Sequence, residues 1–386
     1  MTSAHQHRIN RIGPESFRFS ENNFDLIRLI AAGEVAIRHS IHHLLPGNEE
    51  SLILWVLDFI PGVPIFFFLS GYLISRSWER SQTPRDFFYN RTLRLFPALW
   101  TCTALSVGLL FICGYLATVA WSPYKLVLWI VCQGSIVQFW NPDFLRGFGV
   151  GVVNGSLWSV SVEIQFYIAT AVMYGLLGKL TRARFDMVLV LLVCVFALAN
   201  FWSPEIRAFL DQTFGTRLAS QCFKASFVPW FVMFLLGVIV QRRYEWIVPR
   251  IRARARVILV GYFVVVAVIH FGWGVPLGNE LPVYIVPLLG ATVLATAYSM
   301  PTVSRSVLGS DDWSYGLYIY HMPLVNLALW LGYEGSTGAV WSVLAISALV
   351  AGASWRLVER PLLRRKRSTL REASPVVASA TSMTHG

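Results

Sequence analysis

The sequence predicts an all-α fold, a polytopic bundle of membrane-spanning helices. Of its 386 residues, 55% are hydrophobic and only 14% are charged, whereas soluble domains carry about 25% charged residues. The mean hydropathy is +0.55. Apolar runs of about 20 residues, the length that a helix needs to cross a bilayer, recur along the chain. We therefore expect an integral membrane protein rather than soluble domains.

About ten apolar runs have the length of a spanning helix. The expected spans are residues 24–45, 54–75, 95–118, 156–178, 186–203, 223–241, 256–273, 282–300, 312–331 and 339–357. An eleventh run, 121–140, is interrupted by Lys125, Gln133 and Gln138 and flanked by tryptophans. We expect this segment to lie in the membrane interface or to re-enter the membrane rather than to span it.

Arginines and lysines gather in short loops between the apolar runs, as is typical of loops kept in the cytoplasm. If all of these loops are cytoplasmic and 121–140 does not span, both termini are cytoplasmic too. The net charge of +11 then reflects topology, and we expect no nucleic-acid partner. The expected organisation is a cytoplasmic tail (1–23) without a cleavable signal peptide, a membrane domain (24–361), and a basic, then disordered, tail (362–386).

The five cysteines lie in or beside apolar runs and lack the spacing of metal ligands. We expect neither a metal site nor a disulfide framework.

The first expected helix carries charges where a plain anchor would be apolar. Arg28 and His39 are eleven positions apart, which places them on one helix face about 16 Å apart along the axis. Asp25, one turn before Arg28, can pair with it. Ionisable groups in a spanning helix are costly and usually mark a functional path. The alternative is a peripheral helix with a solvated face.

Two arginines and a Ser-Gly pair stand out next. Arg91 and Arg94, one turn apart just before the third span, present two guanidinium forks, a geometry that matches phosphate. The positive-inside rule alone accounts for some of this charge. Ser70 and Gly71, near the cytoplasmic end of the second span, permit close helix packing or a local unwinding.

The fourth and ninth spans carry further polar candidates. Trp158 and Ser161 line the expected outer part of the fourth span, and Glu163 is too polar to face lipid. Glu163 is suited to acid–base chemistry, to orienting a histidine, or to bundle hydrogen bonding. In the ninth span, His321 is either a site residue or a hydrogen-bonded packing residue.

Six motifs occur in a fixed order and together resemble the acyltransferase-3 family of integral membrane sugar O-acyltransferases. They are FDLIRLIAA with Arg28 and then His39, FFFLSGYLIS, RTLRLFP, SLWSVSVEIQFYI, SYGLYIYHMP and VERP. The resemblance covers Phe24 to about Pro361. One departure is Tyr320, where the family commonly has tryptophan before the histidine of the ninth helix.

The resemblance implies transfer of an acyl group, acetyl by default, from acyl-CoA to a sugar hydroxyl on an exported or cell-surface polysaccharide. The implied catalytic residues are His39, with Glu163 and Asp25 in support. The implied donor-binding residues are Arg28, Arg91, Arg94, Ser70 and Gly71. Candidates on the acceptor side are Trp158, Ser161 and His321. No metal is implied, and the expected setting is the bacterial inner membrane, with glycan-export machinery as a candidate partner.

Two other functions are compatible with these residues. The same intramembrane charges suit a transporter of an anionic substrate, although the sequence has no inverted repeat. An acyltransferase acting on a small molecule or a lipid-linked intermediate is the other alternative. The sequence also leaves open whether the acyl group moves directly to the acceptor or through an acyl-histidine.

Overall fold

The computed structural model describes residues 21–48, 51–275, 277–299, 303–309 and 311–366. The regular elements of this part of the chain are all helices. Most of the two expected tails, 1–20 and 367–386, lies outside the described residues.

The helices follow the predicted order but not all of the predicted boundaries. They are α2 (Phe24–Leu44), α3 (Leu52–Asp58), α4 (Gly62–Arg80), α5 (Pro84–Ile112), α6 (Tyr115–Thr118), α7 (Pro123–Gln133), α8 (Leu157–Leu177), α9 (Arg182–Phe201), α10 (Ser203–Phe214), α11 (Leu218–Lys224), α12 (Phe231–Arg242), α13 (Tyr244–Ala253), α14 (Ala255–Trp273), α15 (Val286–Ser299), α16 (Val303–Leu308), α17 (Ser314–Trp330), α18 (Thr337–Ser354) and α19 (Arg360–Leu363).

Within the described residues, seven helical segments are long and apolar enough to cross a membrane. They are Leu52–Arg80, Pro84–Ile112, Leu157–Leu177, Arg182–Phe201, Leu218–Arg242, Ala255–Trp273 and Thr337–Leu363. The predicted membrane bundle is confirmed, and the count of ten spans stays a prediction. Three expected spans fall outside this set: α2, which is rich in charge, α15, which has 14 residues, and α17, which has 17 residues.

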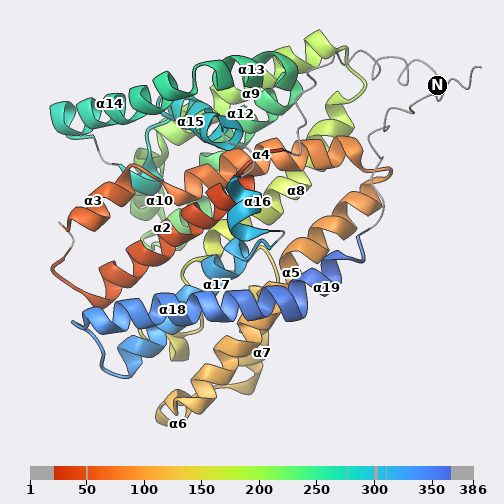
Figure 1. Cartoon of the computed structure of the whole chain (residues 1–386). Coiled ribbons are helices and arrows are strands. Elements are labelled where there is room, and N and C mark those ends of the chain that lie inside the picture. Colours follow the sequence, from red (N-terminus) through yellow and green to blue (C-terminus); the bar gives the residue numbers. More distant parts are fainter. Residues whose placement is uncertain (1–20, 49–50, 276, 300–302, 310, 367–386) are drawn as a thin grey trace, which may run out of the picture.

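Helix α2 lies at the centre of the bundle and packs against α4, α17 and α18 (Figure 1). Its buried face includes Ala31, Ala32 and Ala36, none of which is exposed. Such small residues let neighbouring backbones approach closely. Glu34 is buried and Arg28 and Arg38 are partly buried, whereas Asp25 near the start of the helix is exposed.

Helices α4 and α12 touch at two glycines. A Cβ atom on Gly71 would lie 1.9 Å from the carbonyl oxygen of Phe234, and one on Gly237 would lie 2.2 Å from that of Phe68. Any larger residue at either position would push the backbones apart. Of the two roles considered for the Ser70-Gly71 pair, close helix packing and local unwinding, Gly71 thus has the packing role.

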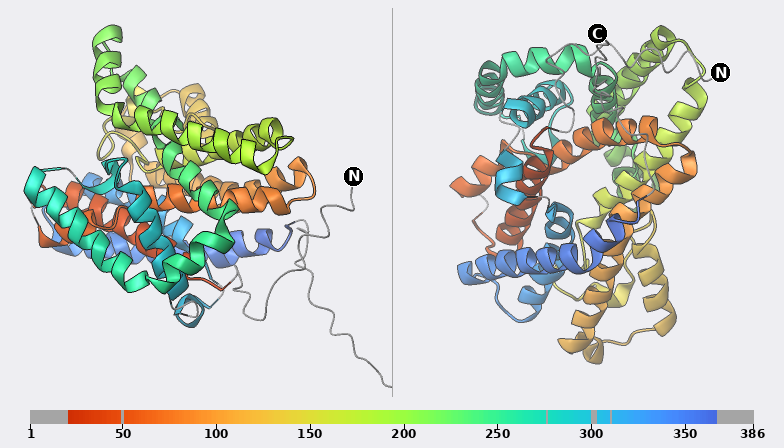
Figure 2. Two further views of the ribbon diagram at one scale, coloured as in Figure 1. Left: turned by 90° about the horizontal axis from the view of Figure 1, so that it is seen from above. Right: turned by 45° about the vertical axis from the view of Figure 1, so that its right-hand side comes forward.

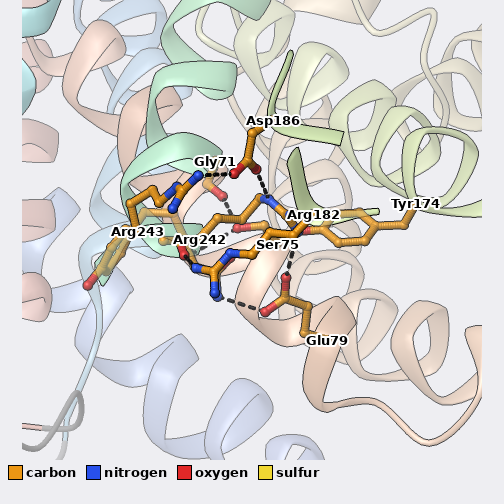
Figure 3. Close-up of polar contacts among 10 residues, drawn as sticks. Gly71, Ser75, Glu79, Tyr174, Arg182, Asp186, Arg242 and Arg243 are labelled. Carbon is orange, nitrogen blue, oxygen red and sulfur yellow. Dashed lines mark hydrogen bonds and ion pairs between the residues drawn. The ribbon is translucent and has the colours of Figure 1, made fainter. Parts of the chain in front are cut away.

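A polar cluster joins four helices at one of their ends (Figure 3). Asp186 of α9 accepts hydrogen bonds from Arg242 (3.0 Å) and Arg243 (2.5 Å) at the end of α12. Glu79 of α4 accepts one from Tyr174 of α8 (3.0 Å) and lies 3.8 Å from Arg242. These contacts fix α4, α8, α9 and α12 relative to one another at this end of the bundle.

Segment 121–140 does not form a spanning helix. Its helix α7 has 11 residues, a length of about 16 Å, so it is too short to cross, as predicted. With α6 and the following loop it builds a lobe with its own core, which includes Tyr115, Trp129 and Phe148. The lobe (gold) extends from one end of the bundle in the right-hand view of Figure 2.

Two helices begin or break at positions that the expected spans did not specify, and proline explains one of them. The expected span 54–75 lies within the apolar segment Leu52–Arg80, but its helix is interrupted before Gly62, so that α3 and α4 are separate, because proline at position 61 begins a helix more readily than it continues one. The expected loop before the third span is largely helical: α5 begins at Pro84, where the side chain of Thr83 accepts a hydrogen bond from the backbone of Asp86. Arg91 and Arg94 therefore stand on α5 rather than in a loop.

Candidate active site

An inner cavity of about 520 Å³ opens between α2, α4, α5, α8 and the start of α17. Its charged lining residues are Asp25, Arg28, Arg91, Arg94, Glu163, Asp312 and Lys366. Ser70 also lines it. The structure thus brings together residues from distant parts of the sequence that were predicted to bind the donor.

Asp312 joins two of the arginines of this cavity. Its Oδ2 accepts a hydrogen bond from Arg28 Nη1 (2.9 Å) and another from Arg94 Nη2. Its Oδ1 accepts one from the hydroxyl of Ser314 (2.5 Å). Asp25, the predicted partner of Arg28, lies 3.6 Å away with its side chain 54% exposed. Asp312 is the closer partner, and the sequence reasoning did not single it out.

Arg91 is held differently from Arg94. Its Nη2 donates a hydrogen bond to Ser77 (2.8 Å), and it forms no ion pair with a carboxylate of the described residues. Glu163, on the same cavity, accepts a hydrogen bond from the hydroxyl of Tyr167 (2.6 Å). Arg91 is therefore a cation with unused hydrogen-bonding capacity on the cavity wall.

Lys366, which follows α19, completes the basic lining. Desolvation, followed by the repulsion of Arg94 and Arg91, lowers the pKa of its ammonium group to about 8, although the residue as a whole is exposed. An anion bound in the cavity would oppose this shift.

A histidine pair lies deeper in the bundle. Nδ1 of His39 is 2.9 Å from Nε2 of His321, the ring centroids are 5.1 Å apart, and His321 is completely buried. Nδ1 of His321 is 3.3 Å from the carbonyl oxygen of Leu317. The sequence analysis singled out both histidines but could not predict that they meet.

The Leu317 contact sets the protonation pattern of the neutral pair. A carbonyl oxygen only accepts, so Nδ1 of His321 carries its proton and Nε2 of His321 is an acceptor. Nδ1 of His39 must then be the donor between the rings, and Nε2 of His39 carries the free lone pair. His39 is thereby arranged as a base, with His321 fixing its tautomer.

The two carboxylates expected to support His39 lie elsewhere. Asp25 precedes His39 by 14 positions on α2, about 21 Å along the axis, and Glu163 is bonded to Tyr167 on the inner cavity. Neither hydrogen-bonds to His39 in the described part of the chain. The partner of the His39 imidazole is His321.

Two candidates on the acceptor side line neither the inner cavity nor the outer one described below. Trp158 packs against Trp230, with ring centroids 5.1 Å apart. Ser161 donates a hydrogen bond to the carbonyl of Ile136. Both connect α8 to its neighbours.

His39 also lines a second, outer cavity of about 320 Å³, together with Arg38, His42, Leu54 and Asp58. The inner and outer cavities share no lining residue. Tyr318 lines the inner cavity, and its ring centroid lies 6.1 Å from that of His321. The histidine pair thus lies between a cationic inner cavity and an outer cavity.

Comparison with known families agrees with this arrangement. Residues 21–358 match the family described as acyltransferase domain. This chain belongs to that acyltransferase family. The histidine pair and the residues that line both cavities lie within the matched region, apart from Leu363 and Lys366.

The acyltransferase is similar along nearly its whole length to curated proteins. Nodulation protein 10 of Rhizobium leguminosarum is 28% identical over 92% of this chain and 98% of its own. The O-acetyl transferase of Shigella phage Sf6 is 26% identical over 89% and 96%. The peptidoglycan O-acetyltransferase OatA of Listeria monocytogenes is 24% identical over 80% of this chain and 52% of its own. No solved structure matches the acyltransferase.

Proposed function

We propose that this acyltransferase moves an acyl group, acetyl by default, from acyl-CoA in the inner cavity to a sugar hydroxyl in the outer cavity. The observation that carries the proposal is the histidine pair, placed between a cationic cavity and a second cavity on its other side. The names of the phage and Listeria relatives favour acetyl as the group and a glycan as the acceptor.

The inner cavity suits the donor because CoA carries phosphate groups. Guanidinium groups bind phosphate with two parallel hydrogen bonds, and Arg28, Arg91 and Arg94 line one cavity. We place this cavity on the cytoplasmic side of the bacterial inner membrane, since Arg91, Arg94 and Lys366, which belong to basic segments expected in the cytoplasm, line it. Arg91 is the first candidate for a phosphate contact because no carboxylate of the described residues pairs with it.

The chemistry follows from the His39 tautomer. Nε2 of His39 takes the proton of the acceptor hydroxyl while its oxygen forms a bond to the thioester carbon. The bond between that carbon and the CoA sulfur then breaks, and His39 returns the proton to the sulfur. Nε2 of His321 accepts the hydrogen bond of Nδ1 throughout and so stabilises the transient imidazolium. The acceptor thus becomes an ester and the donor a free thiol.

In the alternative route, Nε2 of His39 attacks the thioester and carries the acyl group itself. The two routes differ in one observable. An acyl-enzyme forms without acceptor only in the second, so labelled protein after incubation with donor alone would favour it.

The deciding experiment follows label from radiolabelled acetyl-CoA into glycan in membranes that contain the protein. We expect transfer with the wild type, none with His39→Ala, and a donor KM raised at least tenfold in Arg91→Ala/Arg94→Ala, with His39→Ala still binding CoA. Substantial transfer by the folded His39→Ala variant would contradict the proposal. If no variant labels any acceptor while CoA binds, flux of an anionic solute becomes the function to test.

A further inference from the structure

The outer cavity contains an arginine fixed between two carboxylates. Nε of Arg38 donates a hydrogen bond to Glu34 (2.6 Å) and Nη1 contacts Asp58 (2.8 Å). Nη2 of Arg38 is buried and has no hydrogen-bond partner among the described residues. A buried donor without a partner is costly, so the described residues satisfy the guanidinium group of Arg38 only in part.

Both carboxylate oxygens of Glu34 accept hydrogen bonds from within the protein, so Glu34 does not bind a ligand. It is 2% exposed, and its second oxygen accepts a hydrogen bond from the backbone N–H of Gly62 (3.0 Å), the first residue of α4. A Cβ atom on Gly62 would lie 2.6 Å from that oxygen, so the glycine makes room for the carboxylate. Glu34 therefore holds Arg38 in one orientation.

Asp58, in contrast, keeps an oxygen for a ligand. Its side chain is 30% exposed, and only Oδ1 contacts Arg38. The cavity is thus lined by a guanidinium group, which only donates hydrogen bonds, and a carboxylate with a free oxygen, which accepts them. Each sugar hydroxyl both donates and accepts, so two adjacent hydroxyls match such a pair.

We propose that the outer cavity binds the acceptor as a neutral sugar, with two adjacent hydroxyls on Arg38 and Asp58 and the acylated hydroxyl at His39. This inference rests on the proposed function. Because Arg38 and His39 are consecutive on α2, one rigid helix holds both a residue that contacts the sugar hydroxyls and the base.

The charge of the cavity selects against acidic sugars. The single positive charge of Arg38 faces the carboxylates of Glu34 and Asp58. A sugar carboxylate placed there would be repelled by Asp58, which lines the cavity, and would find Arg38 already paired with two carboxylates. We therefore assign neutral hexose units to this site rather than uronic acids.

The test measures binding and transfer separately in detergent-purified protein. The probes are methyl glucoside, methyl mannoside, methyl galactoside, their deoxy analogues and methyl glucuronide. Binding is followed by saturation-transfer NMR without acetyl-CoA, and transfer by release of CoA thiol. The principal variant is Asp58→Asn, with Arg38→Lys as a second, and the exposed Glu205→Gln on α10 as the matched control.

We expect Asp58→Asn to raise the KM of the best neutral acceptor about tenfold, with the KM of acetyl-CoA within twofold of the wild type. Removing one of the two adjacent hydroxyls of the sugar should weaken its binding to the wild type by a similar factor. The same change should weaken binding to Asp58→Asn much less, since that variant has already lost the contact. Glu205→Gln should behave as the wild type.

The two proposals fail in different ways. Transfer to neutral sugars that Asp58→Asn leaves unchanged, tighter binding of the glucuronide, or no binding of any neutral sugar would overturn the acceptor site. Binding that depends on Asp58, without transfer to any sugar, would support the site and overturn the proposed reaction. Thermal unfolding of each variant establishes that it is folded.

Discussion

The inner and outer cavities balance their charges in opposite ways. In the inner cavity, one buried carboxylate, Asp312, serves two arginines, and Arg91 pairs with no carboxylate of the described chain. At the outer cavity, Arg38 pairs with two carboxylates, the cavity-lining Asp58 and the buried Glu34. The inner cavity is thus suited to an anion and the outer one to a neutral polar molecule. The comparison shows that the ratio of arginines to carboxylates at each cavity, more than the net charge of the protein, indicates which ligand that cavity accepts.

The largest effect on activity should come from substituting His321, which belongs to the histidine pair between the cavities. His321→Ala removes the acceptor that fixes the tautomer of His39, and we expect kcat to fall about 100-fold with both KM values nearly unchanged. His321→Gln should recover part of the loss, because its amide oxygen can accept from His39 Nδ1. Steady-state kinetics on both variants tests this. Equal losses in the two variants would indicate that His321 acts through packing alone.

A smaller effect should follow from removing the carboxylate of the inner cavity. Asp312→Asn leaves Arg28 and Arg94 without their shared counter-charge, and breaking one partner of a buried pair destabilises a protein by about 3–5 kcal/mol. A bound phosphate would restore the missing charge. We therefore expect a lower Tm without ligand and a larger upward shift on adding CoA than in the wild type.

The neighbouring Asp311 provides the control for this measurement. It lies 3.5 Å from Arg360 of α19 and 4.0 Å from Arg356 in the helical turn before α19, and it accepts a hydrogen bond from Trp355 (3.0 Å). Asp311 itself does not line the cavity. Asp311→Asn should leave the CoA-induced shift of Tm as in the wild type. The same shift in Asp312→Asn as in the wild type would argue against phosphate binding beside Arg28 and Arg94.

The smallest effect concerns pH at the mouth of the inner cavity. With a pKa of about 8, Lys366 is charged below this pH and loses its charge above it, so donor binding should weaken as pH rises. We expect the KM of acetyl-CoA to increase about twofold from pH 7 to pH 9, a size typical of an exposed charge. Lys366→Arg stays charged and should remove this rise. Identical pH profiles would exclude Lys366 as the cause.

The sequence predicted the parts of the site that one helix determines. Helical spacing placed Arg28 and His39 on one face of α2, and Arg91 beside Arg94. The fold class followed from the apolar runs. Helix ends were less predictable where proline divides a run, as at Pro61, or where a cap extends a helix, as at Thr83.

The contacts between helices could not be predicted in the same way. His39 and His321 are 282 positions apart, and the periodicity within α2 or α17 does not specify which residues of the other helix they meet. For the same reason the role of Asp312 could not be predicted, since its partners lie on other helices, α2 and α5. The acidic pair Asp311-Asp312 directly before an apolar run was the available signal, since a carboxylate there is costly unless paired.

The separation of the two cavities by the histidine pair and Tyr318 has an energetic consequence. In the proposed reaction, an acyl group leaves the inner sulfur and hydrogen replaces it, while the reverse exchange takes place at the outer hydroxyl. No net charge crosses the bilayer, so the electrical potential across the membrane neither drives nor opposes the transfer. The thioester alone supplies the energy, and a cell with a depolarised membrane should modify its glycan as readily as an energised one.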